Sequence, residues 1–247
     1  NSNDETMRNM SRERILHEMR LGPLWKLRQP AAAEATEAVA QPPAIAPDRT
    51  AFAESSAMPL QMPSVDVADI DRMTWDELGS AVADCRRCGL CVARKQAVLG
   101  VGDRQADWLF VGEGPGAEED ERGEPFVGQA GKLLDNMLLA IGLRRGEDVY
   151  IANAVKCRPP ANRTPEVEEI TACRPYLQRQ IALLRPKLIV ALGRPAAQAL
   201  LQSEVKIAAA RGRLHDLDGL PVIVTYHPAY LLRNLPDKAK AWEDLCL

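Results

Sequence analysis

The chain has 247 residues, which at roughly 150 residues per domain allows one or two domains. Its 46% hydrophobic and 26% charged residues exclude a collagen, a coiled coil and a wholly disordered chain. No apolar run approaches the roughly 18 residues of a membrane span, and the polar first residues lack a signal-peptide core, so we expect a cytoplasmic protein with no membrane contact. With a net charge of -3, any nucleic-acid binding needs a local basic patch.

The first 73 residues are expected to lie outside the folded domain. Residues 1–29 carry apolar residues among mixed charges, a pattern that predicts a short amphipathic helix able to bind a protein partner. Residues 30–73 are expected to form a disordered linker, because six prolines and eleven alanines accompany a single aromatic residue between positions 30 and 65. So little apolar bulk does not offset the entropy lost on ordering, and proline removes helical hydrogen bonds.

Residues 74–247 have the pattern of one α/β domain. Thr74 and Glu77 predict a capping box at the start of a helix that runs to Asp84. Four short runs rich in β-branched residues are typical of strands buried on both faces, and helical stretches alternate with them. The expected strands are 108–111, 149–152, 188–192 and 222–224, and the expected helices are 129–141, 166–184 and 194–202. This alternation predicts a mostly parallel four-stranded sheet with helices on both faces.

Polar and glycine residues follow the predicted strands. The first strand is followed by residues 112–116 (GEGPG), the second ends at Asn153, and the fourth leads into His227. Each feature also has a purely structural explanation, and the glycine turn matches neither a phosphate loop nor the dinucleotide fingerprint. Because ligands bind at the carboxyl ends of parallel strands, their convergence on one edge predicts a site for a planar polar ligand.

Six cysteines in a chain expected to be intracellular suggest metal or redox chemistry before disulfides. They form a triplet with two-residue spacings, a later pair separated by fifteen residues, and one isolated residue: Cys85, Cys88, Cys91, Cys157, Cys173 and Cys246. Four thiolates drawn from the two groups could bind zinc or an iron–sulfur cluster. The spacing leaves open which members of the triplet take part, and unrelated buried thiols are the alternative.

The ordered motifs of residues 74–247 resemble those of family 4 uracil-DNA glycosylases, the iron–sulfur members of the uracil-DNA glycosylase superfamily. The motifs are the GEGPG turn followed by Glu119 and Asp120, then residues 123–131 (GEPFVGQAG), 153–160 (NAVKCRPP) and 227–233 (HPAYLLR). The resemblance implies a monomeric, monofunctional hydrolase of base excision repair that flips uracil out of single- or double-stranded DNA and leaves an abasic site. The alternatives are a non-catalytic iron–sulfur DNA-binding module associated with replication proteins and a zinc-binding structural domain.

The resemblance also implies roles for individual residues. A [4Fe-4S] cluster would be held by Cys85, Cys88, Cys157 and Cys173, which leaves Cys91 and Cys246 spare. The implied uracil-binding residues are Gly112, Glu113, Gly114, Phe126, Asn153 and His227. Phe126 would stack on the flipped base, Asn153 would read O4 and N3–H, and His227 would donate to charge that grows on O2. Glu113 joins Asn153 and His227 as a candidate catalytic residue, because related families carry an acidic residue at the position of Gly114.

DNA contacts are expected from local positive charge and from one apolar wedge. The expected phosphate contacts are Arg158, Arg163, Lys206, Arg211, Arg213 and Arg233. Leu231 lies four residues after His227, at the superfamily's wedge position, where an apolar side chain fills the gap left by the flipped base. The alternative for each arginine is a solvated surface position, and the alternative for Leu231 is a helix-core leucine.

Overall fold

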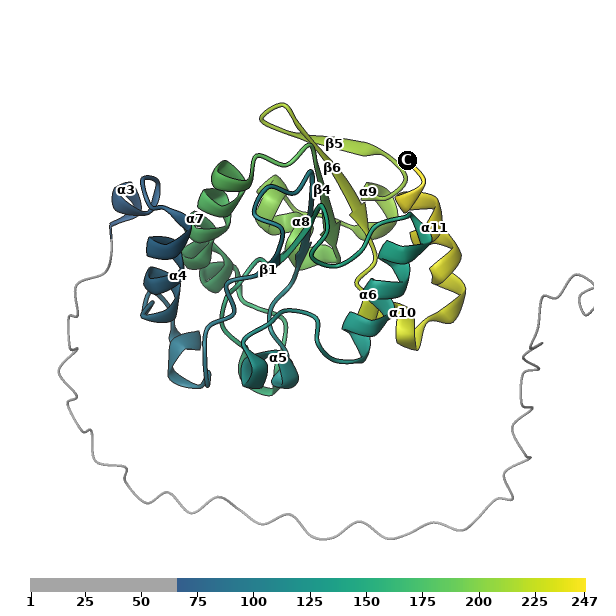
Figure 1. The fold of residues 1–247 in the computed structure, drawn as a ribbon. Helices are drawn as coiled ribbons and strands as arrows, with labels where there is room; N and C mark the ends of the chain where they lie inside the picture. Colours follow the sequence, from purple (N-terminus) through teal and green to yellow (C-terminus); the bar gives the residue numbers. More distant parts are fainter. Residues whose placement is uncertain (1–65) are drawn as a thin grey trace, which may run out of the picture. The chain divides into compact units, whose positions relative to one another are not determined.

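The computed structural model describes residues 66–247, so the expected N-terminal helix and the linker up to residue 65 lie outside the described residues. The core is a six-stranded sheet with the order β1-β3-β2-β4-β6-β5 (Figure 1). Its four central strands are parallel to one another and confirm the four expected strands: β2 (Trp108–Gly112), β3 (Val149–Asn153), β4 (Leu188–Leu192) and β6 (Leu220–Thr225).

Two antiparallel edge strands, β1 (Val101–Gly102) and β5 (Leu214–Leu217), extend the sheet beyond the four expected strands. The sequence pattern missed β1 because it has only two residues, one of them glycine. It missed β5 because none of its residues is buried and two of its four side chains are polar. Strands covered on both faces have a strong apolar signal, whereas edge strands do not.

Helices cover both faces of the sheet (Figure 1). On one face, alternate strand residues such as Val111 and Ala191 pack in one core cluster with α7 (Val167–Leu184), α8 (Arg194–Leu201) and α9 (Ile207–Ala210). On the other face, the intervening residues pack with α6 (Gln129–Ala140) and α11 (Lys238–Leu245), and α10 (Pro228–Arg233) lies against α6. The expected helices are confirmed, and the alternation follows from the two-residue period of a strand.

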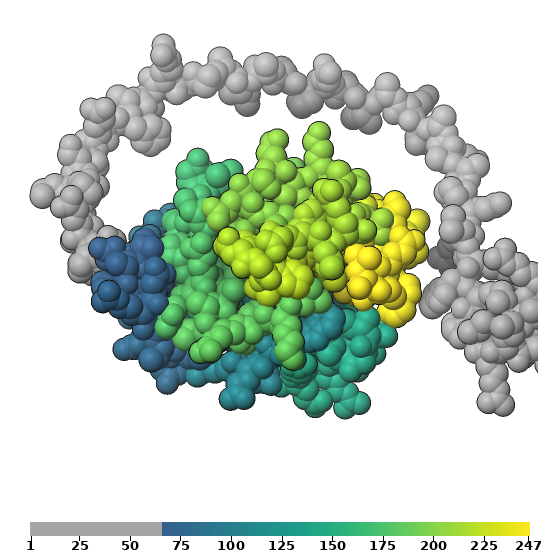
Figure 2. All heavy atoms as spheres, turned by 90° about the horizontal axis from the view of Figure 1, so that it is seen from above, coloured from purple at the N-terminus to yellow at the C-terminus, as the bar shows by residue number. Residues whose placement is uncertain are grey.

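The segment before the sheet packs on α7. The helix α4 (Trp75–Ala83) begins at the expected capping box, in which the Glu77 carboxylate accepts from the Thr74 N–H at 2.8 Å. The preceding α3 (Val67–Ile70) falls in the range expected to be linker, and that expectation is wrong for these residues because Ile70 is fully buried beside Leu78 and Tyr176. Figure 2 shows α3 and α4 at one end of this domain and α11 at the other, with the β5–β6 hairpin between them.

Four further short helices complete the described elements: α5 (Ala117–Arg122), η1 (Gly89–Val92), η2 (Pro160–Asn162) and η3 (Leu235–Asp237). Within residues 66–247, no helix is both long and apolar enough to cross a membrane.

Candidate active site

The site begins where β2 and β3 end side by side. Gly112 is the register partner of Asn153, and the Ala154 N–H donates to the Gly112 carbonyl at 2.8 Å. A Cβ on Gly112 would lie 2.4 Å from Asn153 Oδ1 and 2.6 Å from the Phe126 ring. Glycine at this position therefore lets both side chains close over the strand end.

Gly114 faces a similar restriction. A Cβ at this position would lie 2.7 Å from Cγ2 of Val155, whose N–H donates to the Glu113 carbonyl at 3.2 Å. A side chain at position 114 would therefore displace Val155, which follows β3. In the sequence, Glu113 is the carboxylate nearest to the end of β2.

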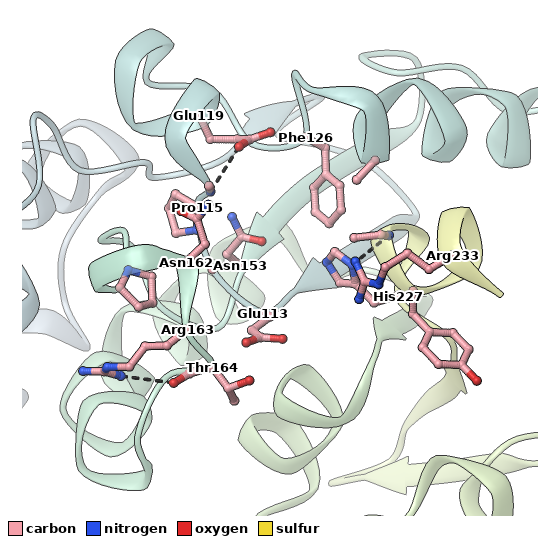
Figure 3. Close-up of a pocket in the computed structure, with 16 residues that line it drawn as sticks. Glu113, Pro115, Glu119, Phe126, Asn153, Asn162, Arg163, Thr164, His227 and Arg233 are labelled. Carbon is pink, nitrogen blue, oxygen red and sulfur yellow. Dashed lines mark hydrogen bonds between the residues drawn. The ribbon is translucent and has the colours of Figure 1, made fainter. Parts of the chain in front are cut away.

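A pocket of about 470 Å³ opens at this edge, and its lining includes Glu113, Gly114, Phe126, Asn153 and His227. Figure 3 shows Asn153 and Glu113 in the middle of the pocket, with Phe126 and His227 together on one side. The structure therefore brings together five of the six residues expected to bind uracil, and Gly112 lies directly beneath two of them.

Asn153 is 2% exposed, and its Oδ1 has no hydrogen-bond partner in the described part of the chain. A buried acceptor without a partner costs roughly 1–3 kcal/mol. Native proteins rarely carry such a group without a functional reason, because more than nine-tenths of buried polar groups are paired. A donor group of a bound ligand could therefore pair with this oxygen.

His227 is held as a neutral imidazole. Its Nδ1 accepts the Ala229 N–H at 3.1 Å, so the single proton of the neutral ring lies on Nε2. Burial and the nearby positive charge of Arg233 lower the pKa of His227 to about 4, against a smaller opposing effect of Glu119. Gly193, with φ of 91°, makes room for this residue, since a Cβ there would lie 3.0 Å from the His227 Cβ. The ring is an N–H donor at neutral pH.

Phe126 stacks on His227, with 5.4 Å between ring centroids and 28° between planes. The segment around Phe126 is joined to the glycine turn by Glu119, which the sequence analysis noted without a role. The Glu119 carboxylate accepts N–H groups from Gly116 at 3.0 Å, Val127 at 2.9 Å and Gly128 at 3.2 Å. The spacing of Gly116 and Glu119, N-cap and N3 of α5, is the sequence signal that could have revealed this link.

Glu113 is half-buried in the pocket, and this burial raises its pKa above the ordinary range. The Thr164 hydroxyl and the charge of Arg194 act in the opposite direction and favour the carboxylate. Sequence reasoning missed both residues because they lie far along the chain, Thr164 in the loop before α7 and Arg194 at the start of α8. Thr164 shares the pocket lining with Glu113 (Figure 3).

Cys85, Cys88, Cys157 and Cys173 line one small cavity between α4 and α7. Neither Cys91 nor Cys246 is among its lining residues in the described part of the chain. Tyr176 also lines this cavity, and its hydroxyl is buried. Within residues 66–247, no group of three or more His, Cys, Asp or Glu side chains is arranged to hold a single metal ion.

The walls of this cavity carry donors that point at sulfur. Arg94 Nη1 donates to Cys157 Sγ at 2.8 Å, and the Lys156 N–H donates to Cys173 Sγ at 3.3 Å. Burial raises the pKa of Cys157 to about 11 and that of Cys173 to about 12. A bound cationic metal group would be needed to keep such buried thiols ionised. The donor set therefore fits an iron–sulfur cluster, whose sulfurs commonly accept N–H groups.

Lys156 connects the cysteine cavity with the pocket. Its Nζ donates to the Asn153 carbonyl at 2.8 Å and to Gln180 Oε1 at 2.5 Å, although the residue is only 1% exposed. Burial lowers the pKa of Lys156 to about 8, while Cys173 and Cys157 act in the opposite direction. A buried ammonium thus holds the main chain of the residue that faces the pocket.

Two expectations about DNA contacts are wrong. Arg211 is not free to meet phosphate, because its guanidinium, 16% exposed, bonds to Asp244, Glu243 and the Lys240 carbonyl. Leu231 is 1% exposed and packs between α6 and α11, so it does not reach a DNA surface. The helix-core alternative therefore holds for Leu231, and the adjacent Leu232 is the exposed leucine, at 40%.

The other basic residues differ in their surroundings. Arg163 lines the pocket, but both of its terminal nitrogens bond to Glu169, at 2.8 and 2.7 Å. Arg158 is partly exposed and bonds to Asn162 Oδ1 at 2.7 Å. Arg213 and Lys206 are exposed away from the pocket lining, whereas Arg233 is exposed at the rim, close to His227 (Figure 3).

Residues 99–246 match the family model of the uracil DNA glycosylase superfamily. The fold and the pocket are thus those of this superfamily. The chain is 43% identical to the type-4 uracil-DNA glycosylase of Pyrobaculum aerophilum, over 71% of this chain and 93% of that protein. It is 50% identical to the type-4 enzyme of Thermotoga maritima, over 65% and 86%, and 46% identical to that of Archaeoglobus fulgidus, over 64% and 82%. This chain belongs to the type-4 uracil-DNA glycosylases.

Proposed function

We propose that this chain excises uracil from DNA by hydrolysing the N-glycosidic bond, which leaves an abasic site for base excision repair. The observation that supports this most directly is the buried Asn153 Oδ1 without a partner, beside an aromatic wall and a neutral histidine donor. A flipped pyrimidine would supply the missing donor and occupy the space between these groups.

The Watson–Crick edge of uracil matches the Asn153 amide, whereas that of cytosine does not. Asn153 Oδ1 accepts from N3–H while its NH2 group donates to O4. Cytosine presents an amino donor in place of O4 and an unprotonated N3. The Asn153 NH2 group would then face another donor, and Asn153 Oδ1 would face another acceptor. A site built on buried hydrogen bonds rejects such an analogue strongly, because the polar groups of the site are left unpaired.

His227 supports departure of the base. As the glycosidic bond breaks, negative charge grows on uracil O2, and a neutral Nε2–H donor stabilises it without first losing a hydration shell. One such preorganised donor is worth roughly 3–4 kcal/mol in the transition state. Phe126 would stack on the face of the base and, through its contact with His227, fix the position of the donor.

Glu113 is our candidate for the group that stabilises the positive charge on the sugar. The departing uracil leaves positive character on the sugar, and a nearby carboxylate can stabilise it or orient the attacking water. Support comes from its position in the pocket and from the packing at Gly114, where a side chain would displace Val155. Thr164 and Arg194 favour the ionised form that this role requires.

Cys85, Cys88, Cys157 and Cys173 would hold a [4Fe-4S] cluster. When bound, this group would supply strong sulfur–iron bonds that tie the segment before the sheet to the loop after β3 and to α7. Its function is thus structural, and Lys156 links the same loop to Asn153. A broad visible absorbance band with matching iron content supports the cluster, whereas stoichiometric zinc without that band contradicts it.

Cys157→Ala should destabilise the whole domain rather than only lower turnover. The cluster would close a chain loop of about seventy residues between Cys88 and Cys157, and its binding free energy is part of the free energy of folding. Thermal unfolding and iron content are the measurements, and Cys91→Ala, outside the cavity, is the matched control. An iron-free Cys157→Ala protein with the parental Tm would contradict the proposed structural role.

Uracil-containing DNA is the proposed substrate, and the wedge is reassigned to Leu232. This residue is exposed on α10, whose Ala229, Tyr230 and Arg233 line the pocket. Leu232→Ala should leave Tm unchanged and lower excision from duplex DNA about tenfold, or about 1.4 kcal/mol, with a smaller loss on single strands that need no unstacking.

Leu231→Ala is the control for this reassignment. It removes a fully buried side chain and should cost roughly 2–5 kcal/mol of stability. Equal loss from Leu232→Ala on single- and double-stranded substrates would show that the residue does not fill the gap in the duplex.

The activity itself is tested by incubating the full chain with an oligonucleotide that contains one uracil and then cleaving abasic sites with alkali. Strand cleavage at the uracil position supports the proposal, and a matched substrate with cytosine should stay intact. Tight binding to DNA without cleavage would favour the non-catalytic DNA-binding module instead.

A further inference from the structure

The loop that carries Phe126 has a backbone conformation that needs outside support. Phe126 has φ of 56°, in the left-handed region that bulky residues rarely occupy. Such a conformation costs roughly 1–3 kcal/mol and persists only where neighbouring groups fix it. Because the ring forms one wall of the pocket and stacks on His227, the conformation of this one residue decides where the wall stands.

Arg145, in the loop between α6 and β3, supplies that support. Its Nη1 donates to the Pro125 carbonyl at 2.9 Å and its Nη2 to the Phe126 carbonyl at 2.8 Å. Its Nε donates to Asp135 Oδ1 of α6 at 2.9 Å, and the side chain is only 24% exposed. All three nitrogens of the guanidinium are thus used, which lysine, with one point charge, does not reproduce.

Packing fixes the same carbonyl from a second direction. A Cβ on Gly131, in the first turn of α6, would lie 1.7 Å from the Phe126 oxygen. The carbonyl therefore rests directly on the helix backbone, and only glycine leaves space for it. On the amide side, Glu119 binds the N–H groups of Val127 and Gly128. The segment is held on its carbonyl side by Arg145 and on its amide side by Glu119.

Arg145 does not belong to the pocket lining that the structure describes, so it can affect chemistry there only through the residues it holds. We propose that Arg145, oriented by Asp135, is a positioning residue for uracil excision that keeps the Phe126 ring at the stacking distance from the flipped base and from His227. This inference rests on the function proposed above. A displacement of about 1 Å at such a site can cost about a hundredfold in rate.

The test is a double-mutant cycle between Arg145→Met and Phe126→Ala, with single-turnover excision and affinity for free uracil as readouts. Arg145→Met alone should lower kcat/KM about 10- to 100-fold and weaken uracil binding, and Arg145→Lys should fall between it and the parent. In the Phe126→Ala background, Arg145→Met should change kcat/KM by no more than about twofold, since the ring through which it acts is gone.

Arg144→Met is the matched control, because Arg144 is the exposed neighbour of Arg145 and should leave both readouts unchanged. Independent, multiplicative losses in the double mutant would overturn the inference and assign Arg145 a general structural role. If Arg145→Met does not fold, the same cycle with Arg145→Lys decides between the two. A parental chain that leaves uracil in place would instead contradict the proposed function, so the two failures are distinguishable.

Discussion

Asn153→Ala should reduce uracil excision by about three orders of magnitude or more without lowering Tm. The loss follows because the amide is the group that pairs with N3–H and O4, and a site that loses such hydrogen bonds discriminates by up to about 10⁴-fold. The stability should hold because the substitution removes a buried oxygen that has no partner in the described protein. Truncating most buried side chains lowers the stability of a protein. Removing a buried polar group that has no hydrogen-bond partner can instead be neutral or favourable.

Asn153→Asp gives the sharper test of base reading. When protonated, the aspartic acid offers one O–H donor and one acceptor, which suits cytosine N3 and its amino group. We therefore expect Asn153→Asp to lose most uracil excision and to gain slow cytosine excision that increases at lower pH, while Asn153→Ala shows no such gain. Excision from matched single-uracil and single-cytosine oligonucleotides measures both. Parental rates on uracil in both variants would show that Asn153 does not read the base.

The sequence could predict the residues of this site that lie at the ends of strands. Asn153 and His227 follow apolar runs that have the composition of buried strands, and parallel topology sends such residues to one edge. The orphaned oxygen of Asn153 and the tautomer of His227 were not predictable, because each depends on which groups surround the side chain in space. Gly112 was visible as a glycine, but the reason for it appears only when Phe126 lies against it.

The errors arose where burial, rather than residue type, decides the role. Leu231 and Leu232 are adjacent leucines on α10, and a shift of one position on a helix turns one toward α6 and α11 and the other toward solvent. Arg211 has the residue type of a phosphate contact, yet three acceptors of α11 already surround it. Arg145 lay outside every recognised motif, since its contribution is made through the carbonyls of residues 20 and 19 positions earlier in the chain.

His227→Gln should lower single-turnover excision about 10²- to 10³-fold, the effect of losing one preorganised donor from an oxyanion-type site. Glutamine keeps a donor but not the ring that stacks on Phe126, so its N–H group is not held in the same position. The parental rate should show no inflection from His227 between about pH 8 and about pH 6, because its pKa in the folded protein is about 4. An acid limb that arises from protonation of Glu113, whose pKa is raised, should disappear in Glu113→Gln.

The lowered pKa of His227 also has a consequence for stability. Between the ordinary value of 6.5 and about 4, the unfolded chain binds a proton that the folded chain excludes. The contribution of this residue to the free energy of unfolding is therefore fully present above pH 6.5 and is lost progressively as the pH falls toward 4. The Tm of the parent should fall more steeply over this window than that of His227→Gln, and comparing the two cancels the opposite contribution of Glu113. Parallel Tm curves, or an inflection in the parental rate near pH 6.5 that His227→Gln abolishes, would show that the imidazole keeps its ordinary pKa in the folded protein, which contradicts a pKa of about 4.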